Sequence, residues 1–243
     1  MFDHVTIRVS DRAASEAFYE LVLHGIGIDE TYADEHFAEW DDFSIVQATD
    51  EISATQRLHL GFAARSRVDV DEFWRTGVAA GFRSDGEPGP RPQYSPAYYG
   101  SFLLDPDGNS IEAVEHEGTA ARTGLDHLWM RVADIRASRR FYELVAPFGG
   151  YEIRTDTSAR VSFRGANGTF SILPGAATVN VHLAFPATEN ATVDAFHRAA
   201  TDAGYRDNGA PGERPIYHAG YYGAFVLDPD GNNVEVVNHN RAA

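Results

Sequence analysis

The chain has 243 residues and repeats itself once, and this repeat constrains its fold more than any other feature. Segments in the first half return 123 residues later in the second half with the same or closely related residues. The register slips by four residues near residue 43 and then recovers, as expected for two hairpin loops of different length within one preserved fold. The matched segments are 3–5 and 126–128, 18–22 and 141–145, 59–60 and 182–183, 98–100 and 221–223, and 105–109 and 228–232.

A repeat this long is a domain rather than one turn of a solenoid. The sequence therefore predicts two tandem domains, residues 1–117 and residues 126–243, joined by a linker at residues 118–125. Duplication of this kind turns the two-fold interface of a dimer into an interface within one chain. We expect the protein to be either a monomer that is itself a pseudo-dimer, or a homodimer.

Each copy reads as a β-α-β-β-β module that occurs twice, which predicts four modules in all. Strict alternation of apolar and polar residues indicates the strands, and Asp11 is placed to cap the first helix. The fold class is α+β, with helices on one face of curved, mostly antiparallel sheets. In the first module of the first copy we expect a strand at 4–9, a helix after Asp11, and short strands near 31 and at 37–40 and 43–47. In the second module we expect a strand around 58–62, a helix at 70–80 ended by Gly81, and a loop at 86–96. Two strands, at 99–104 and 110–116, then lie on either side of a turn at 105–109.

Composition excludes several classes of function. The 20 basic and 36 acidic residues leave a formal charge of −16, which argues against nucleic acid or an anionic membrane as partner. The chain has no cysteine and no lysine, so disulfides, thiolate sites and Schiff-base lysines are ruled out. No apolar run is long enough to span a bilayer, and the start of the chain lacks a signal-peptide pattern. We expect a cytoplasmic protein that acts on a small molecule.

Three polar residues stand in the middle of predicted strands in each copy, on the face opposite the aliphatic stripe. Two imidazoles and one carboxylate can hold Fe(II), Mn(II), Ni(II) or Zn(II) and leave positions open for a substrate. A single histidine on a strand is more often structural, but both copies keep the whole set although their local sequences differ. The candidate ligands are His4, His59 and Glu112 in the first copy, and His127, His182 and Glu235 in the second.

Each copy resembles the vicinal oxygen chelate superfamily, which includes glyoxalase I, bleomycin-resistance proteins, fosfomycin-resistance proteins and extradiol dioxygenases. The resemblance is carried by the opening Asp-His, the Phe-Tyr-Glu of the first helix, the His-Leu in mid-domain, and the closing Asp-Pro-Asp-Gly-Asn followed by Glu. It implies paired modules that form a U-shaped sheet around a divalent metal ion, with the six candidate residues as ligands. It leaves open whether each site forms within one copy or across the two.

Departures from the subfamilies narrow this resemblance. Glyoxalase I uses four protein ligands, two of them glutamates, whereas a histidine stands at the mid-domain position here. Extradiol dioxygenases use two histidines and one glutamate, but they expect an aromatic hydroxyl where this chain has Phe102 and Phe225. The extradiol pattern also has a histidine several residues upstream. His218 stands at this position in the second copy, whereas the first copy has Ser95 there. The basic residues that could form an anion pocket of the fosfomycin type are Arg8, Arg91, Arg131 and Arg214.

Two classes of function follow from these observations. One is a metal-dependent lyase, isomerase or ring-cleaving dioxygenase, with His218, Tyr217 and Tyr94 as acid–base residues. The other is a metal-free protein that binds an antibiotic or metabolite in a cleft lined by tryptophan and tyrosine. A third arrangement has metal in one half only, and His218 favours the second half. His116 and His239 lie four residues past the glutamates, roughly 13 Å away along a strand, and we interpret them as strand-end residues.

Overall fold

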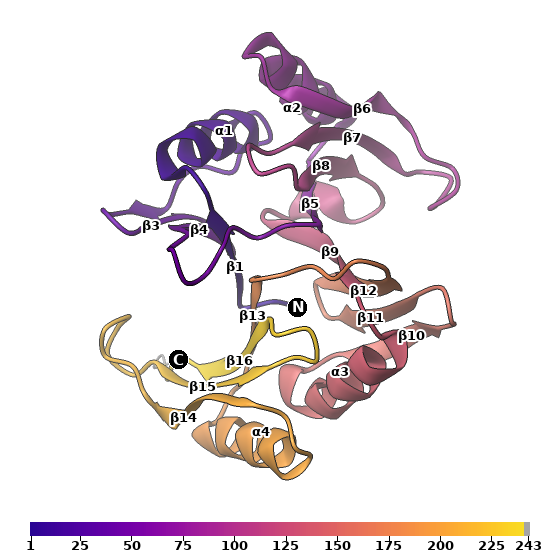
Figure 1. Ribbon diagram of the computed structural model, residues 1–243. Coiled ribbons are helices and arrows are strands. Elements are labelled where there is room, and N and C mark those ends of the chain that lie inside the picture. Colours follow the sequence, from indigo (N-terminus) through magenta and orange to yellow (C-terminus); the bar gives the residue numbers. More distant parts are fainter. Residues whose placement is uncertain (241–243) are drawn as a thin grey trace. The chain divides into compact units, whose positions relative to one another are not determined.

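A computed structural model describes residues 1–240 and confirms the α+β class with four β-α-β-β-β modules (Figure 1). The first half contains β1 (His4–Val9), α1 (Arg12–His24), β2 (Tyr32–Ala33), β3 (Phe37–Trp40), β4 (Phe43–Gln47), β5 (Leu58–Ala63), α2 (Arg67–Ala79), β6 (Arg83–Pro90), β7 (Tyr99–Leu104) and β8 (Ser110–Glu115). A short 3-10 turn, Thr119–Ala121, leads to the second half. That half contains β9 (Leu125–Val132), α3 (Ile135–Gly149), β10 (Glu152–Asp156), β11 (Val161–Gly165), β12 (Gly168–Pro174), β13 (His182–Pro186), α4 (Asn190–Asp202), β14 (Asp207–Glu213), β15 (Tyr222–Leu227) and β16 (Asn233–Asn238).

The chain packs as two compact units whose boundary falls inside strands rather than in the predicted linker. One unit, called here the N-unit, is residues 6–129. The other, called the C-unit, is residues 1–5 together with the chain from residue 130 onward. The first strand of each copy therefore begins in the unit that contains most of the other copy.

Strand order within each unit follows the repeat. In the N-unit, neighbouring strands run β1-β4-β3-β2 and β9-β5-β8-β7-β6. In the C-unit they run β14-β15-β16-β13 followed by the first residues of β1, and β10-β11-β12 followed by the end of β9. The pairs β5–β8 and β13–β16 are parallel, whereas β3–β4, β6–β7, β7–β8, β14–β15 and β15–β16 are antiparallel. This agrees with the prediction of mostly antiparallel sheets.

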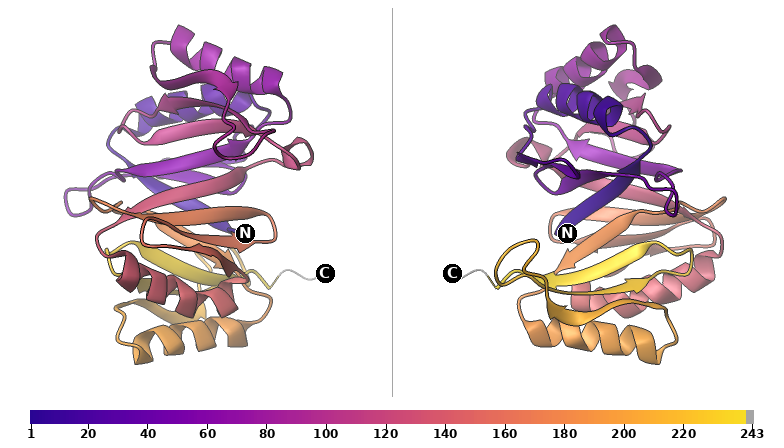
Figure 2. Two further views of the ribbon diagram at one scale, coloured as in Figure 1. Left: turned by 90° about the vertical axis from the view of Figure 1, so that its right-hand side faces the viewer. Right: turned by 60° about the vertical axis from the view of Figure 1, so that its left-hand side comes forward.

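Side chains cap the starts of helices α1 and α2. The Asp11 side chain accepts a hydrogen bond from the backbone of Ala14 at the start of α1, as predicted. Helix α2 begins earlier than predicted because Ser66 caps it, and Gly81 follows its end with a positive φ of 91°. Both views in Figure 2 show α4, in orange, running along β14 and β15. Among the residues described, no helix is long and apolar enough to cross a membrane.

The prediction of a loop at residues 86–96 is partly wrong. Residues up to Pro90 belong to β6, which pairs with β7 through two shifts of register. Such irregularities let a glycine- and proline-rich segment pair with a neighbouring strand without continuous ladder hydrogen bonds. The remaining residues, 91–96, form the turn that leads into β7.

The Asp-Pro-Asp-Gly-Asn motif is a buried turn that fixes the strands around it. The Tyr19 hydroxyl of α1 donates to Asp105 Oδ2 at 2.9 Å, and Asp105 also accepts from the backbone of Asn109. The Asn109 side chain then bonds the backbone of Thr55 and Leu58 at the start of β5. The second copy repeats these contacts through Tyr142, Asp228, Asn232, Thr178 and Val181. The motif therefore sets β5 and β8 side by side at a fixed register.

Removing the anchoring hydroxyl should destabilise the fold. Tyr19→Phe leaves the buried Asp105 carboxylate with one donor fewer, which we expect to cost about 1–3 kcal/mol in the free energy of unfolding. Tyr32→Phe removes a similar bond at an exposed site and should leave the unfolding midpoint unchanged. Denaturant unfolding measures both, and equal midpoints for the two variants would contradict this role of the motif.

Two candidate metal centres

The six candidate ligands form two clusters, and each cluster combines residues of both copies. In the N-unit, His59 on β5 and Glu112 on β8 meet His127 on β9. In the C-unit, His182 on β13, Glu235 on β16 and His4 on β1 lie together. Within each cluster, one ligand atom of every residue lies within 4.8 Å of the others. Of the two arrangements that the sequence left open, the structure has the one across copies.

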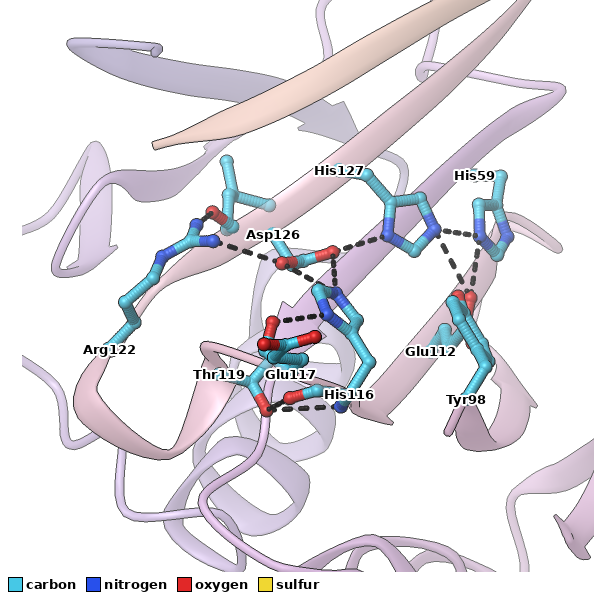
Figure 3. Close-up of polar contacts among 10 residues, drawn as sticks. His59, Tyr98, Glu112, His116, Glu117, Thr119, Arg122, Asp126 and His127 are labelled. Carbon is cyan, nitrogen blue, oxygen red and sulfur yellow. Dashed lines mark hydrogen bonds and ion pairs between the residues drawn. The ribbon is translucent and has the colours of Figure 1, made fainter. Parts of the chain in front are cut away.

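The N-unit cluster is compact (Figure 3). Glu112 Oε2 lies 3.0 Å from His59 Nε2 and 3.2 Å from His127 Nε2. The two Nε2 atoms are 3.1 Å apart. Ligands held about 2.1 Å from one ion at angles of about 90–110° stand roughly 3.0–3.4 Å from each other. The spacing of these three atoms therefore fits a single divalent ion.

The C-unit cluster is wider on one side. His182 Nε2 lies 2.9 Å from Glu235 Oε2, but His4 Nε2 lies 3.7 Å from the same oxygen. The planes of the two imidazoles cross at 80°, whereas those of His59 and His127 in the N-unit cross at 30°. The same three residue types thus meet with different geometry in the two units.

Register on the sheet brings the ligands together. His59 and Gly61 point to the same face of β5 because side chains alternate along a strand. Gly61 is paired with Glu112 across the parallel β5–β8 ladder. On the other side of β8, Gly100 of β7 leaves room for the carboxylate, since a Cβ there would overlap Glu112 Oε1. Glycine at this position is therefore required for the close approach of the glutamate.

A second layer of side chains orients the ligands in the N-unit. The Tyr98 hydroxyl donates to Glu112 Oε1 at 2.8 Å, which leaves Oε2 facing the imidazoles. The His127 Nδ1–H donates to Asp126 at 3.0 Å, so in the neutral ring Nε2 carries the lone pair that a metal ion needs. Figure 3 shows Asp126 held in turn by His116, at 3.1 Å, and by Arg122, also at 3.1 Å.

The C-unit repeats the tyrosine, aspartate and histidine contacts of this layer and adds a second histidine. Tyr221 donates to Glu235 at 2.7 Å, and Asp3 lies 2.9 Å from His4 Nδ1. His239 bonds Asp3 at 2.9 Å, as His116 bonds Asp126 in the N-unit. Here His218 adds a contact that the N-unit lacks, because its Nε2 lies 2.7 Å from His239 Nδ1 and Ser95 stands at the equivalent position.

The charges in the N-unit cluster depend on one another. Burial opposes ionisation of Glu112, but hydrogen bonds from His127 and His59 outweigh it and lower its pKa to about 2. Burial disfavours the charged form of His127, yet its bonds to Asp126 and Glu112 raise its pKa to about 9. Burial lowers the pKa of His59. At neutral pH the metal-free cluster therefore holds an ionised glutamate and a protonated His127.

The predicted acid–base residues lie one layer away from the clusters. Tyr94 packs against the rings of Tyr98 and Trp129, with centroids at 5.0 and 5.7 Å, and is 45% exposed. Tyr217 packs against Tyr221 at 4.8 Å and is 61% exposed. His218 reaches His4 through the bonds of His239 and Asp3 described above.

The sequence analysis does not identify the residues that orient the ligands, although these residues also recur in both copies. The aspartates precede His4 and His127 in both copies, and Tyr98 and Tyr221 belong to a repeated Tyr-Tyr-Gly. His116 and His239 recur as well, but we interpreted them as strand-end residues because of their distance from the glutamates. Neither belongs to a ligand cluster in the structure, and both instead hydrogen-bond the aspartates that orient His127 and His4.

Two of the candidate anion-binding arginines anchor loops. Arg91 lies over the ring of Phe102 at 5.3 Å and donates to the backbone carbonyl of Glu87 at 2.7 Å. Arg214 does the same with Phe225 and Ala210. These contacts hold the turns that follow β6 and β14.

Loss of the orienting carboxylate should weaken metal binding without removing a ligand. Asp126→Asn leaves His127 in place but weakens the control of its tautomer, and such outer partners are worth about 10–100-fold in metal affinity. Asp71→Asn, which removes the charge of an exposed carboxylate that accepts a bond from Tyr99, is the control and should bind metal normally. Calorimetric titration with Co(II) across a range of pH gives the metal affinity that each variant has when the His127 ring is neutral, and an unchanged value in Asp126→Asn would argue against the orienting role.

Comparison with known proteins agrees with the fold. Residues 1–113 and 124–236 match the sequence profile described as Glyoxalase/Bleomycin resistance protein/Dioxygenase superfamily. Glyoxalase I from Zea mays is similar at 18% identity and a TM-score of 0.62, covering 98% of this chain and 92% of that one. A proposed dioxygenase from Bacillus subtilis subsp. subtilis str. 168 is similar at 13% identity and a TM-score of 0.67, covering 99% and 86%. No curated protein matches the chain.

Proposed function

The chain belongs to the Glyoxalase/Bleomycin resistance protein/Dioxygenase superfamily, and from that membership we propose that it is a divalent-metal-dependent enzyme acting on a small substrate with two neighbouring oxygens. The reaction class is a lyase or isomerase reaction, or cleavage of a ring by a dioxygenase. The observation that supports this most is the duplicated His-His-Glu cluster, above all the 3.0–3.2 Å spacing of its three ligand atoms in the N-unit. The metal is one of Fe(II), Mn(II), Ni(II) or Zn(II).

The residues of each cluster have separate roles in holding a metal ion. His59, His127 and Glu112 would hold the ion in the N-unit, and their equivalents would hold it in the C-unit. When bound, the ion supplies Lewis acidity toward the substrate oxygens. Glu112 contributes the negative charge of the protein ligands, and burial beside Glu112 holds the pKa of Tyr98 well above its usual range. Tyr98 therefore stays protonated and serves as a hydrogen-bond donor rather than a base.

Proton transfer is better provided for in the C-unit. His218 bonds the carbonyl of Ala219 and His239, and His239 bonds Asp3. This chain of contacts connects His218 with the aspartate beside His4, and His218 is our candidate general acid in this unit. Tyr217, and Tyr94 in the other unit, are exposed and are the further candidates for proton transfer.

A metal-free binding protein is the second candidate. The ring of Trp129 lies 5.3 Å from His59 and 5.7 Å from Tyr94, so aromatic faces stand directly beside the N-unit cluster. Such faces favour binding of a flat apolar ligand by stacking. In that case the histidines and glutamates would serve as hydrogen-bonding groups.

Acetohydroxamate, a small chelator with two neighbouring oxygens, distinguishes the two functions. The chain is loaded in turn with Fe(II), Mn(II), Ni(II) and Zn(II), and acetohydroxamate is titrated onto the loaded and the chelator-stripped protein by calorimetry. The proposal expects binding only to protein loaded with one of these metals. Equal binding with and without metal would support the binding protein, and failure to take up any metal would rule out the enzyme.

A further inference from the structure

One difference between the two clusters is a methyl group on the strand beside the glutamate. Gly61 on β5 is paired with Glu112 on β8, and Ala184 on β13 is paired with Glu235 on β16 in the same parallel register. The two positions are equivalent in the repeat, 123 residues apart. Gly61 faces His127, which β9 contributes, and Ala184 holds the matching place on β13.

Gly61 is the surface on which His127 lies. A Cβ at this position would stand within 2.7 Å of three atoms of the His127 ring, Cε1, Nδ1 and Nε2. Real Cβ atoms do not approach other atoms this closely, so the ring rests directly on the glycine backbone. The His127 side chain is 6% exposed as a result. From this position Nε2 reaches both His59 and Glu112.

In the C-unit, Ala184 carries the methyl group that Gly61 lacks. The His4 ring is oriented differently from the His127 ring. It is nearly perpendicular to the ring of His182, and its Nε2 is 3.7 Å from Glu235 Oε2. The His4 side chain is 23% exposed. The orienting contacts do not account for this difference. The tyrosine–glutamate bonds are 2.8 and 2.7 Å, and the aspartate–histidine bonds are 3.0 and 2.9 Å, in the N-unit and C-unit respectively.

We propose that the two clusters bind a metal ion with different affinities. The residue at the equivalent positions 61 and 184 sets this difference by positioning the histidine of the neighbouring strand. This rests on the proposed function. The N-unit cluster holds its three ligand atoms at the spacing of one ion before any ion binds. In the C-unit, His4 must move toward Glu235 first, and this reorganisation reduces affinity. The N-unit is therefore the high-affinity site.

Variants that leave one cluster intact test the inequality. His182→Ala leaves the N-unit cluster and His59→Ala leaves the C-unit cluster, and Mn(II) titration followed by electron paramagnetic resonance gives the dissociation constant of each. We expect Mn(II) to bind the N-unit cluster at least about tenfold more tightly. Adding Gly61→Ala to the first variant should weaken binding about tenfold or more, and adding Ala184→Gly to the second should tighten it. Equal affinities, or no response to either exchange, would overturn the proposal.

Folding and ring placement have their own controls. In an otherwise wild-type chain, Gly61→Ala should leave Mn(II) binding at the C-unit cluster unchanged, which shows that the variant is folded. Nuclear magnetic resonance of the metal-free chain should show close contact between the His127 ring and the Gly61 α-protons. Absence of the His127 contact would overturn the positioning role whether or not metal binds. Failure of both clusters to bind Mn(II) would instead overturn the proposed function, and the unequal metal sites with it.

Discussion

Replacing Glu112 with glutamine is expected to abolish stoichiometric metal binding at the N-unit cluster, with affinity for Mn(II) reduced by at least about a hundredfold. Outer partners of metal ligands are alone worth about 10–100-fold, and this change removes the only charged protein ligand of the cluster. The glutamine still accepts the Tyr98 hydrogen bond and has nearly the same volume. The loss therefore reports the missing charge rather than a packing defect.

Glu115→Gln is the matched control for this prediction. Glu115 lies on the same strand three residues later, faces Arg67 and is partly exposed. Its replacement should leave two metal equivalents bound and the unfolding midpoint unchanged. Glu235→Gln should remove only the C-unit ion, because that glutamate belongs to the other cluster. Normal metal content in Glu112→Gln would mean that the cluster is a hydrogen-bonded structural core and not a metal site.

Metal affinity at the N-unit cluster should rise steeply with pH. The pKa of His127 is raised to about 9, so its ring is protonated at neutral pH and must release that proton before Nε2 can bind an ion. We expect affinity for Co(II) to increase about tenfold per pH unit between pH 6.5 and 8.5, with close to one proton released per ion. Calorimetry of His182→Ala in buffers of different ionisation enthalpy measures both quantities for this cluster alone.

The same proton stabilises the metal-free chain, with the opposite dependence on pH. A histidine whose pKa is higher in the folded state contributes stability that is fully present below its unfolded value of about 6.5 and is lost as pH rises through about 9. Asp126→Asn removes one of the two carboxylates that raise the pKa, so its metal affinity should level off at a lower pH than in the parent. An affinity that is flat above pH 6.5 in the parent protein would contradict the raised pKa of His127.

Much of the fold follows from local patterns in the sequence. Strands β1 and β7 have their predicted bounds, and Asp11 and Gly81 mark helix ends for the reasons expected from capping. Strand β6 was missed because its glycines and prolines give no alternating pattern, and it forms only by pairing with β7 through bulges. Pairing of this kind depends on a partner strand that a local pattern does not identify.

For the candidate site, the sequence likewise predicts the residue types but not how they group. The six candidate ligands could be chosen because each recurs in both copies on the polar face of a strand. Their grouping could not, because His4 joins His182 and His127 joins His59 through contacts between strands far apart in the sequence. Tyr94 and Tyr98 lie in the same repeated stretch, and only the folded turn shows that Tyr98 bonds Glu112.

The most direct test of two metal sites that each combine both copies is the metal content of two double variants. Wild-type protein should hold about two equivalents of metal per chain. His59→Ala with His127→Ala removes two ligands of one cluster and should leave one equivalent, whereas His59→Ala with His4→Ala damages both clusters and should leave none. The reverse result, none in the first double variant and one in the second, would show that each site forms within one copy and would contradict this account.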